Sequence, residues 1–135
     1  LNEELKLKES TLIIFVSDHG FLLGEHDLWQ KPNLFENTLR IPLIISDPRS
    51  AKAGLSSDSL IELIDIYPTI LELSDLEIPK YVSGKSFAAL VNRPSMPFRK
   101  SALSQSHARV TQPNLKKENI FGYSLRTEQF RYTEW

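Results

Sequence analysis

A continuous run of β-branched and apolar residues, Thr11–Val16, leads directly into the polar segment Ser17–Gly20. Because apolar and polar residues do not alternate in it, the run is typical of a strand buried on both faces in the centre of a parallel sheet. In open α/β sheets, ligands bind at the carboxyl ends of the strands. Asp18 and His19 stand at such an end, and Gly20 behind them permits close approach of the backbone. The sequence therefore predicts an α/β fold with a site where this strand ends.

The next segments supply the other elements of such a fold. A second apolar run, Ile41–Ser46, predicts another buried strand. The clearest helical periodicity covers Leu55–Leu76, with Ser57 or Asp58 as the candidate N-cap. Pro68 lies inside this segment and predicts a kink or a break just before it. Strand, loop, strand and helix in this order indicate a layered α/β domain.

Beyond residue 93 the character of the sequence changes. The Pro-containing stretch 94–97 has the composition of a linker. In Ile120–Leu125 and Gln129–Thr133, aromatic and β-branched residues alternate with polar ones, which predicts an antiparallel hairpin with one wet face. We therefore divide the chain into an α/β core at 1–93 and, at 94–135, a linker followed by the start of a small antiparallel subdomain.

The composition excludes several classes of protein. The chain of 135 residues opens on a polar segment with helical spacing, Leu1–Lys8. Basic and acidic residues number 16 and 17, so the basic surplus expected of a nucleic-acid binder is missing. There is no cysteine, which excludes a disulfide scaffold, a cysteine-ligated zinc site and a thiol nucleophile. No apolar run approaches the ~18–20 residues that span a bilayer. We expect neither a nucleic-acid partner nor a membrane span.

Several residue types after the first strand can carry chemistry. The adjacent carboxylate and imidazole of Asp18 and His19 can ligate a divalent cation or transfer protons. In the alternative reading, Asp18 caps a turn and His19 is a hydrogen-bonded surface residue. His26 and Lys31 follow on a glycine-containing loop that is short enough to return to the same strand edge. A lysine there can neutralise an anionic substrate group, although a solvated loop lysine has the same local sequence. His107 stands alone in a polar segment, and we expect it at the surface.

Taken together and in order, these motifs resemble a known family. The motifs are Ser17–Gly20, Leu23–His26, Trp29–Lys31, Arg40–Ile44, Glu62–Thr69, Gly84–Phe87, Gly122–Thr127 and Arg131–Trp135. Their succession is similar to the C-terminal half of type I sulfatases of the alkaline phosphatase superfamily, and most similar to the iduronate-2-sulfatase-like group. The resemblance covers nearly the whole chain from Thr11. It implies the C-terminal portion of the α/β sandwich of that superfamily, joined to a small antiparallel β subdomain.

The resemblance also implies roles for individual residues. Asp18 and His19 match the late pair of ligands to a divalent cation, which is usually calcium in sulfatases. Lys31 matches the lysine that contacts the sulfate group. Phe21 and His26 fall on the loop that faces the substrate. For the parent enzyme the resemblance implies hydrolysis of a sulfate ester, of a sugar or a glycosaminoglycan-like substrate, in an exported, periplasmic or lysosomal-type compartment.

Two parts of a sulfatase active site are not found in the sequence. The family needs an early pair of acidic metal ligands and a formylglycine nucleophile, and both are expected upstream of residue 1. Ser95–Arg99 fits the Ser-x-Pro-x-Arg core of the serine-type formylglycine signature. It comes after Asp18 and His19 rather than long before them, and Gln105 stands where the signature has glycine. We interpret this match as coincidental.

The chain is therefore interpreted as a C-terminal fragment of a sulfatase that is inactive by itself. A phosphodiesterase or phosphonate hydrolase of the same superfamily is an alternative, because these enzymes share the metal site at a strand end. A third alternative is a non-catalytic remnant used for binding. If early strands of the parent sheet are missing, the runs Thr11–Val16 and Ile41–Ser46 present uncovered apolar surface, so we expect the isolated chain to self-associate.

Overall fold

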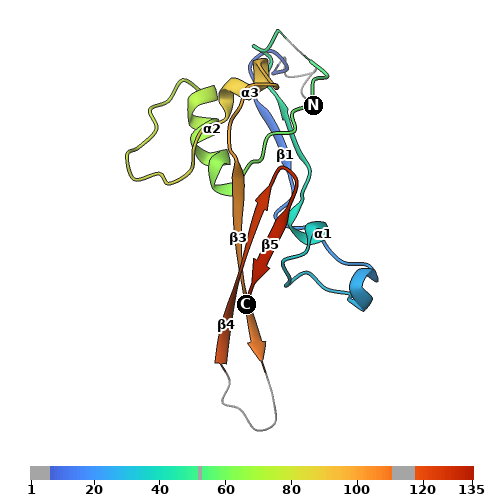
Figure 1. Cartoon of the computed structure of the whole chain (residues 1–135). Helices are drawn as coiled ribbons and strands as arrows, with labels where there is room; N and C mark the ends of the chain where they lie inside the picture. Colours follow the sequence, from blue (N-terminus) through green and yellow to red (C-terminus); the bar gives the residue numbers. More distant parts are fainter. Residues whose placement is uncertain (1–6, 52, 111–117) are drawn as a thin grey trace. The chain divides into compact units, whose positions relative to one another are not determined.

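A computed structural model describes residues 7–51, 53–110 and 118–135, apart from the side chains of residues 108–110, 118 and 119. The elements are β1 (Ile13–Val16), η1 (Glu25–Asp27), α1 (Glu36–Leu39), β2 (Leu43–Ser46), η2 (Leu63–Asp65), α2 (Ile66–Leu73), α3 (Ala88–Asn92), β3 (Ser101–Val110), β4 (Glu118–Thr127) and β5 (Arg131–Glu134) (Figure 1). The helix expected over Leu1–Lys8 lies largely outside the described residues.

Two compact units share these elements. The first comprises the chain up to Val16 together with Leu43–Arg99, and the second comprises Ser17–Pro42 together with Lys100–Trp135. The loop that follows β1 is thus grouped with the C-terminal sheet. The division of the chain at residue 94 stays a prediction.

β1 and β2 form the sheet of the first unit. They pair antiparallel, with Ile14 opposite Ile45 and Phe15 opposite Ile44. The prediction of strands in these two runs is confirmed. The prediction that β1 is a parallel strand buried on both faces is wrong for this pair, since Phe15 and Ile44 are exposed. An unbroken apolar run indicates a strand with apolar residues on both faces, but it does not indicate whether the neighbouring strand is parallel or antiparallel.

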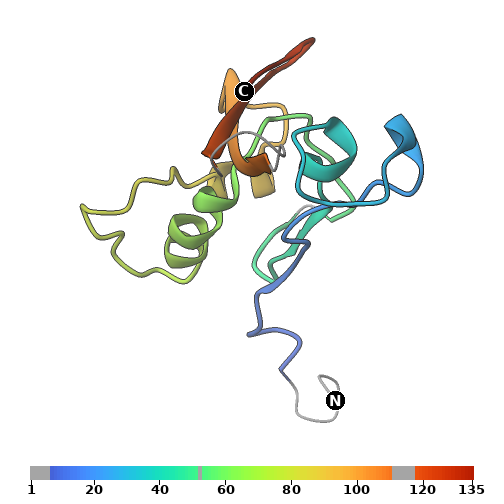
Figure 2. The same cartoon turned by 90° about the horizontal axis from the view of Figure 1, so that it is seen from below.

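The helical part of the first unit is shorter than predicted. The segment 55–62 has no helix, and the backbone becomes helical only at η2, which passes into α2. Pro68 stands in the first turn of α2, where its missing N–H costs no helical hydrogen bond. The N-cap of α2 is Asp65, so the prediction of Ser57 or Asp58 is wrong. Figure 2 shows α2 in green and the loop that follows it along the chain, which turns back toward α3.

The core of the first unit joins α2 and α3 through a buried hydroxyl. Thr69 is fully buried; it donates to the Asp65 carbonyl at 2.6 Å and accepts from the Phe87 N–H at 3.0 Å. Phe87, which directly precedes α3, packs edge-on against Phe98 with ring centroids 6.1 Å apart. The hydrogen bond from Phe87 to Thr69 fixes the start of α3 against α2.

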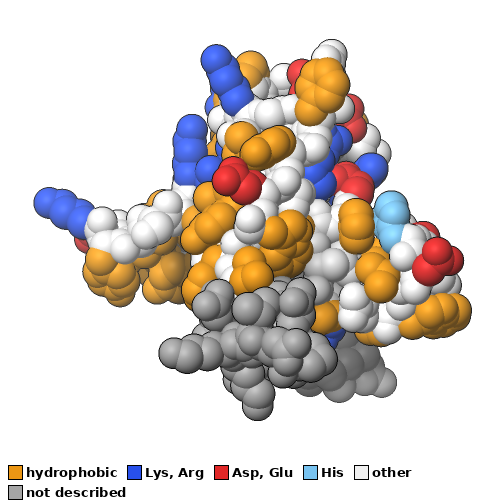
Figure 3. Space-filling model, turned by 60° about the horizontal axis from the view of Figure 1, so that its bottom comes forward, with side chains coloured by type: hydrophobic (Ala, Val, Ile, Leu, Met, Phe, Trp, Pro, Cys, Tyr) orange, Lys and Arg blue, Asp and Glu red, His pale blue; other side chains and the backbone are white. Residues whose placement is uncertain are grey.

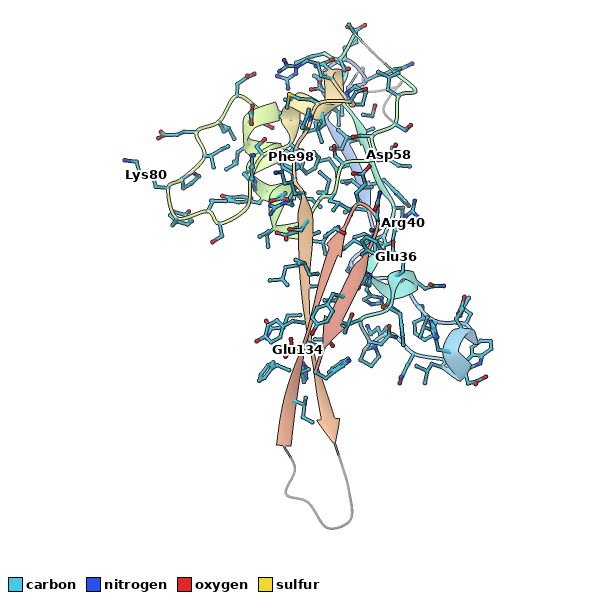
Figure 4. The ribbon with its side chains drawn as sticks, viewed as in Figure 1. Glu36, Arg40, Asp58, Lys80, Phe98 and Glu134 are labelled. Atoms are coloured by element: carbon cyan, nitrogen blue, oxygen red, sulfur yellow. The ribbon has the colours of Figure 1, made fainter. Side chains whose placement is uncertain are left out.

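A charged cluster around Asp65 closes the same unit. The Asp65 carboxylate accepts from the Lys85 N–H at 2.7 Å and from Arg99 Nη2 at 2.6 Å. Arg99 Nη1 lies 3.2 Å from Glu62 Oε2. Gly84 fits here because a Cβ would lie only 1.9 Å from the Ile64 carbonyl oxygen. Arg99, which directly follows the labelled Phe98 in Figure 4, therefore has a structural role, in keeping with the interpretation that Ser95–Arg99 matches the formylglycine signature by coincidence.

The second unit is built on a three-stranded antiparallel sheet, β3–β4–β5 (Figure 1). β4 pairs with β5 through Leu125 opposite Tyr132 and Arg126 opposite Arg131, which confirms the predicted hairpin. Ser124, at the centre of β4, is fully buried and accepts from Arg131 Nη1 at 2.9 Å. His107 on β3 is exposed, as predicted.

Many large apolar side chains reach the surface of the described residues; Figure 3 shows those on one face in orange. Ile13, Phe15 and Val16 of β1 and Ile44 of β2 are exposed, so part of the apolar surface of the two strands is uncovered. Within residues 7–51, 53–110 and 118–135, no helix has the length and apolar character needed to cross a bilayer.

Candidate functional site

The orientation of the His19 ring is set by its own backbone. Nδ1 lies 2.8 Å from the Gly20 carbonyl oxygen, which can only accept a hydrogen bond. We therefore assign the ring proton of neutral His19 to Nδ1, which leaves a lone pair on Nε2. Lys31 Nζ lies 2.9 Å from Nε2 and donates to this lone pair. The two residues, twelve positions apart in the sequence, thus meet as the loop length predicted.

Asp18 places a carboxylate beside the same nitrogen. One oxygen, Oδ1, accepts from the His19 N–H at 3.0 Å, and Oδ2 lies 3.4 Å from His19 Nε2. The Asp18 side chain is 84% exposed, so its oxygens keep lone pairs for a ligand. Asp18, His19 and Lys31 are called the Asp–His–Lys cluster below.

Gly20 holds this cluster against the loop that follows. Its N–H donates to the Thr38 carbonyl at 2.8 Å. A Cβ on Gly20 would lie 2.0 Å from the Asn37 carbonyl oxygen, inside van der Waals contact, so only glycine fits. The glycine of the predicted site motif is therefore required for close packing between the cluster and the end of α1.

A buried polar network shapes the rest of the loop. Thr38 Oγ1 donates to Asn33 Oδ1 at 2.7 Å, and Asn33 Oδ1 also accepts from the Phe35 N–H at 3.0 Å. Asn33 and Thr38 are both buried, next to Leu34. These hydrogen bonds satisfy polar groups that burial would otherwise destabilise. The sequence analysis missed both residues, because an Asn and a Thr five positions apart carry no recognisable signal.

The predicted substrate-facing residues lie on the segment between His19 and Lys31. Phe21 is exposed. His26 has a left-handed backbone, with φ of 55°, and its ring stacks on Phe35 with centroids 4.0 Å apart. Glu25 ties the segment to α1, since it accepts from the Leu23 N–H at 2.7 Å and from Asn37 Nδ2 at 3.3 Å. Hydrogen bonds from the backbone N–H groups of Glu25 itself and of Leu23 hold the pKa of the Glu25 carboxyl below its usual range.

An ion pair anchors α1 to the sheet of the second unit. Glu36, labelled in Figure 4, accepts from Arg131 Nε at 2.9 Å and Nη2 at 2.6 Å, and Arg126 Nε lies 3.4 Å away. Burial tends to raise the pKa of the Glu36 carboxyl, but the hydrogen bonds and charge of Arg131, with Arg126, lower it below its usual range. Because 95 residues separate Glu36 from Arg131, sequence reasoning had no means to find this pair.

The donor atoms of the cluster fit part of a metal site. A carboxylate oxygen and an imidazole lone pair lie side by side, and both are common ligands of divalent cations. Within the described residues, no group of three or more histidine, cysteine, aspartate or glutamate side chains is placed to hold a metal. Asp18 and His19 have the chemistry to supply two ligands, and a complete coordination sphere needs others.

Comparison with known proteins identifies the family of the chain. The sequence model of the family described as N-sulphoglucosamine sulphohydrolase, C-terminal, matches residues 24–135. The chain belongs to this sulfatase family. The predicted resemblance to sulfatases is confirmed, and with it the expected fold class.

Two curated sulfatases are similar to this sulfatase domain over nearly its whole length. N-acetylglucosamine-6-O-sulfatase of Bacteroides thetaiotaomicron is 32% identical over 96% of the chain. Human iduronate 2-sulfatase is 29% identical over 98% of it. The chain spans 23% of the first protein and 34% of the second, which means that it corresponds to a quarter to a third of such enzymes.

Two solved structures are similar to the chain in three dimensions. BT4656, solved in complex with its substrate D-glucosamine-2-N,6-O-disulfate, matches 98% of the sulfatase domain with a TM-score of 0.80 and 29% identity. The phosphonate monoester hydrolase of Silicibacter pomeroyi matches 99% of it with a TM-score of 0.83 and 27% identity. The chain spans 26% and 28% of these two proteins.

Proposed function

We propose that this chain is the C-terminal part of a sulfatase that hydrolyses a sulfate ester of a sugar. The observation that carries the proposal is the Asp–His–Lys cluster, in which Lys31 Nζ lies 2.9 Å from His19 Nε2 in a chain of this family. Curated relatives named for N-acetylglucosamine 6-sulfate and iduronate 2-sulfate support a sulfated sugar as the substrate.

In this proposal Lys31 contacts the sulfate group. An ammonium has three N–H donors, and those that do not bind His19 are available to sulfate oxygens. Its positive charge offsets the negative charge that develops on those oxygens in the transition state.

Asp18 and His19 would hold the divalent cation, with calcium as the proposed ion. A bound cation polarises a sulfate or nucleophile oxygen as a Lewis acid. Asp18 offers a hard oxygen ligand of the kind calcium prefers, whereas His19 offers nitrogen. The Nε2 lone pair serves either Lys31 or a cation, but not both.

The nucleophile is proposed to lie outside these residues. The chain has no cysteine, and the arginine of the one serine-type match, Arg99, is bound to Asp65 and Glu62. We propose a formylglycine in another segment of the longer protein, and we expect the 135-residue chain to release no sulfate by itself. Phe21 and His26 are proposed to face the substrate.

Two lysine-to-alanine variants of the longest natural gene product that contains this sequence, compared by kcat/KM, test the proposal. We expect Lys31→Ala to lower kcat/KM for glucosamine 6-sulfate by about 100-fold or more, the usual cost of removing one charge-stabilising donor. Lys80→Ala, on an exposed loop of the first unit, is the matched control and should leave the rate unchanged (Figure 4). Equal rates for Lys31→Ala and wild type would contradict the role of Lys31.

Hydrolysis of a phosphonate monoester is the second candidate activity, because the structure of the phosphonate monoester hydrolase matches the chain as well as BT4656 does. Parallel assays with a sulfate monoester and a phosphonate monoester decide between them. We expect the sulfate ester to be the better substrate, and a higher kcat/KM for the phosphonate would reverse the assignment. Activity should also fall on treatment with a chelator and return with calcium.

The isolated chain is also proposed to self-associate through the exposed apolar faces of β1 and β2. Light scattering of the 135-residue chain should show a mass that rises with concentration. A constant monomer mass at high concentration would contradict this.

A further inference from the structure

The segment between His19 and Lys31 contains a short hairpin with two different faces. The Leu22 N–H donates to the Gln30 carbonyl at 3.1 Å, and the Gly24 N–H donates to the Leu28 carbonyl at 3.0 Å. This antiparallel register places Leu23 opposite Trp29.

The exposure of the side chains follows this register. Leu22 is 0% exposed, whereas Leu23 is 64% and Trp29 72% exposed. We call Leu23 and Trp29 the apolar hairpin face. Exposed apolar surface next to charged groups often marks a ligand-binding site.

Gly24 holds the Trp29 ring in place. Three atoms of the indole lie within 3.8 Å of the position that a Cβ on Gly24 would occupy, and the φ angle of Gly24 is 119°. The indole therefore lies over bare backbone in the turn, which restricts its rotation while most of the side chain stays exposed.

Trp29 of the apolar hairpin face and Lys31 of the Asp–His–Lys cluster flank Gln30, whose carbonyl pairs with the Leu22 N–H in the hairpin. Lys31 follows Trp29 by two residues, and side chains two positions apart in an extended strand point to the same side, about 7 Å apart. An apolar surface thus stands beside the ammonium group that we assign to the sulfate.

We propose that the apolar hairpin face binds the sugar ring whose sulfate ester contacts Lys31, with Trp29 as a specificity-determining residue. This inference rests on the proposed function. A pyranose ring carries C–H groups on its faces, and these pack favourably against the electron-rich face of an indole. One ligand then meets both surfaces, since its ring is apolar on one face and its sulfate is anionic.

The test separates recognition of the sugar from recognition of sulfate in the full-length gene product. Glucosamine 6-sulfate is the substrate, and inorganic sulfate, which lacks the ring, is the competitive inhibitor. We expect Trp29→Ala to raise KM about tenfold and to leave the inhibition constant of inorganic sulfate within twofold of wild type. Trp29→Phe should restore most of the affinity. Phe130→Ala is the matched control, because Phe130 is also 72% exposed in the same unit.

Four results would overturn the proposal. An unchanged KM would remove Trp29 from substrate binding and leave the proposed function intact. Equal weakening of the sugar sulfate and inorganic sulfate would mean that Trp29 only supports the cluster. A fall in Tm with unchanged KM would mean that another protein segment covers the face. If wild type hydrolyses neither glucosamine 6-sulfate nor iduronate 2-sulfate, the proposed function fails and this inference fails with it.

Discussion

Asp65 in the first unit and Asp18 in the second are both carboxylates with a basic neighbour, and they differ most in exposure. Asp65 is 0% exposed and accepts from Glu62, Lys85 and Arg99. Asp18 is 84% exposed, and its carboxylate lies against the backbone N–H and the ring of His19. A buried carboxylate with its acceptor positions filled stabilises the fold, whereas an exposed one beside a lone pair remains available to a ligand. The burial of an aspartate, rather than its residue type, thus decides whether it stabilises the fold or is available to bind a ligand.

The largest expected effect on stability comes from removing the buried carboxylate of Asp65. Asp65→Ala leaves Arg99 without its shortest partner and removes the acceptor of two backbone N–H groups. We expect a loss of about 3 kcal/mol in the free energy of unfolding, at the low end for a broken buried pair because Arg99 is partly exposed. Urea unfolding measures it. Asp58→Ala, at an exposed position labelled in Figure 4, should cost under about 0.5 kcal/mol. Equal costs for the two variants would contradict this account of Asp65.

Gly84 in the first unit and Gly20 in the second, both packed closely against backbone, allow the same comparison between structure and ligand binding. An added Cβ meets a backbone oxygen at 1.9 Å from Gly84 and at 2.0 Å from Gly20. We expect each Gly→Ala variant to lose about 2 kcal/mol, as for other overpacked sites. Only Gly20→Ala should also weaken inhibition by inorganic sulfate, because Gly20 positions His19 and Lys31. Ser83→Ala, at the exposed position before Gly84, is the control. A Gly84→Ala variant that weakens sulfate binding equally would remove the distinction.

The Glu36 ion pair gives a smaller effect with a defined pH dependence. The pKa of Glu36 is lowered in the folded state, so its contribution is present above the unfolded pKa of about 4.5 and is lost as pH falls through the folded pKa. With screening discounted for this half-exposed group, Glu36→Gln should cost about 1 kcal/mol at pH 7. Thermal unfolding of variant and wild type should converge toward pH 3. A difference that grows on acidification would have the wrong sign.

The smallest effect on stability is expected at the exposed carboxylate. Asp18→Asn should change the free energy of unfolding by less than about 0.5 kcal/mol, since the side chain is exposed. The same variant should weaken calcium binding by the full-length protein, measured by titration calorimetry, because an amide is a poorer ligand than a carboxylate. A large loss of stability with unchanged calcium affinity would place Asp18 with Asp65 as a structural residue.

Local patterns in the sequence account for the elements whose partners are close in the chain. Alternation in Ile120–Leu125 and Gln129–Thr133 predicted β4 and β5, because a hairpin needs only a turn and two complementary faces. The return of Lys31 to the strand end at His19 agrees with the expectation that this loop is short enough to reach the same strand edge. The helix boundary was missed, because Pro68 is compatible with the first turn of a helix as well as with a break.

The sequence by itself thus predicted the hairpin of β4 and β5 and the return of Lys31 toward the end of β1, and it indicated the sulfatase family through the order of its motifs. Only the tertiary structure decided the antiparallel pairing of β1 with β2 and the partners of Asp65 and Glu36. The physical reason is that hydrophobic periodicity and turn chemistry act over a few residues. Ion pairs and sheet partners instead join residues tens of positions apart, where only the folded chain brings the charges and backbone groups together.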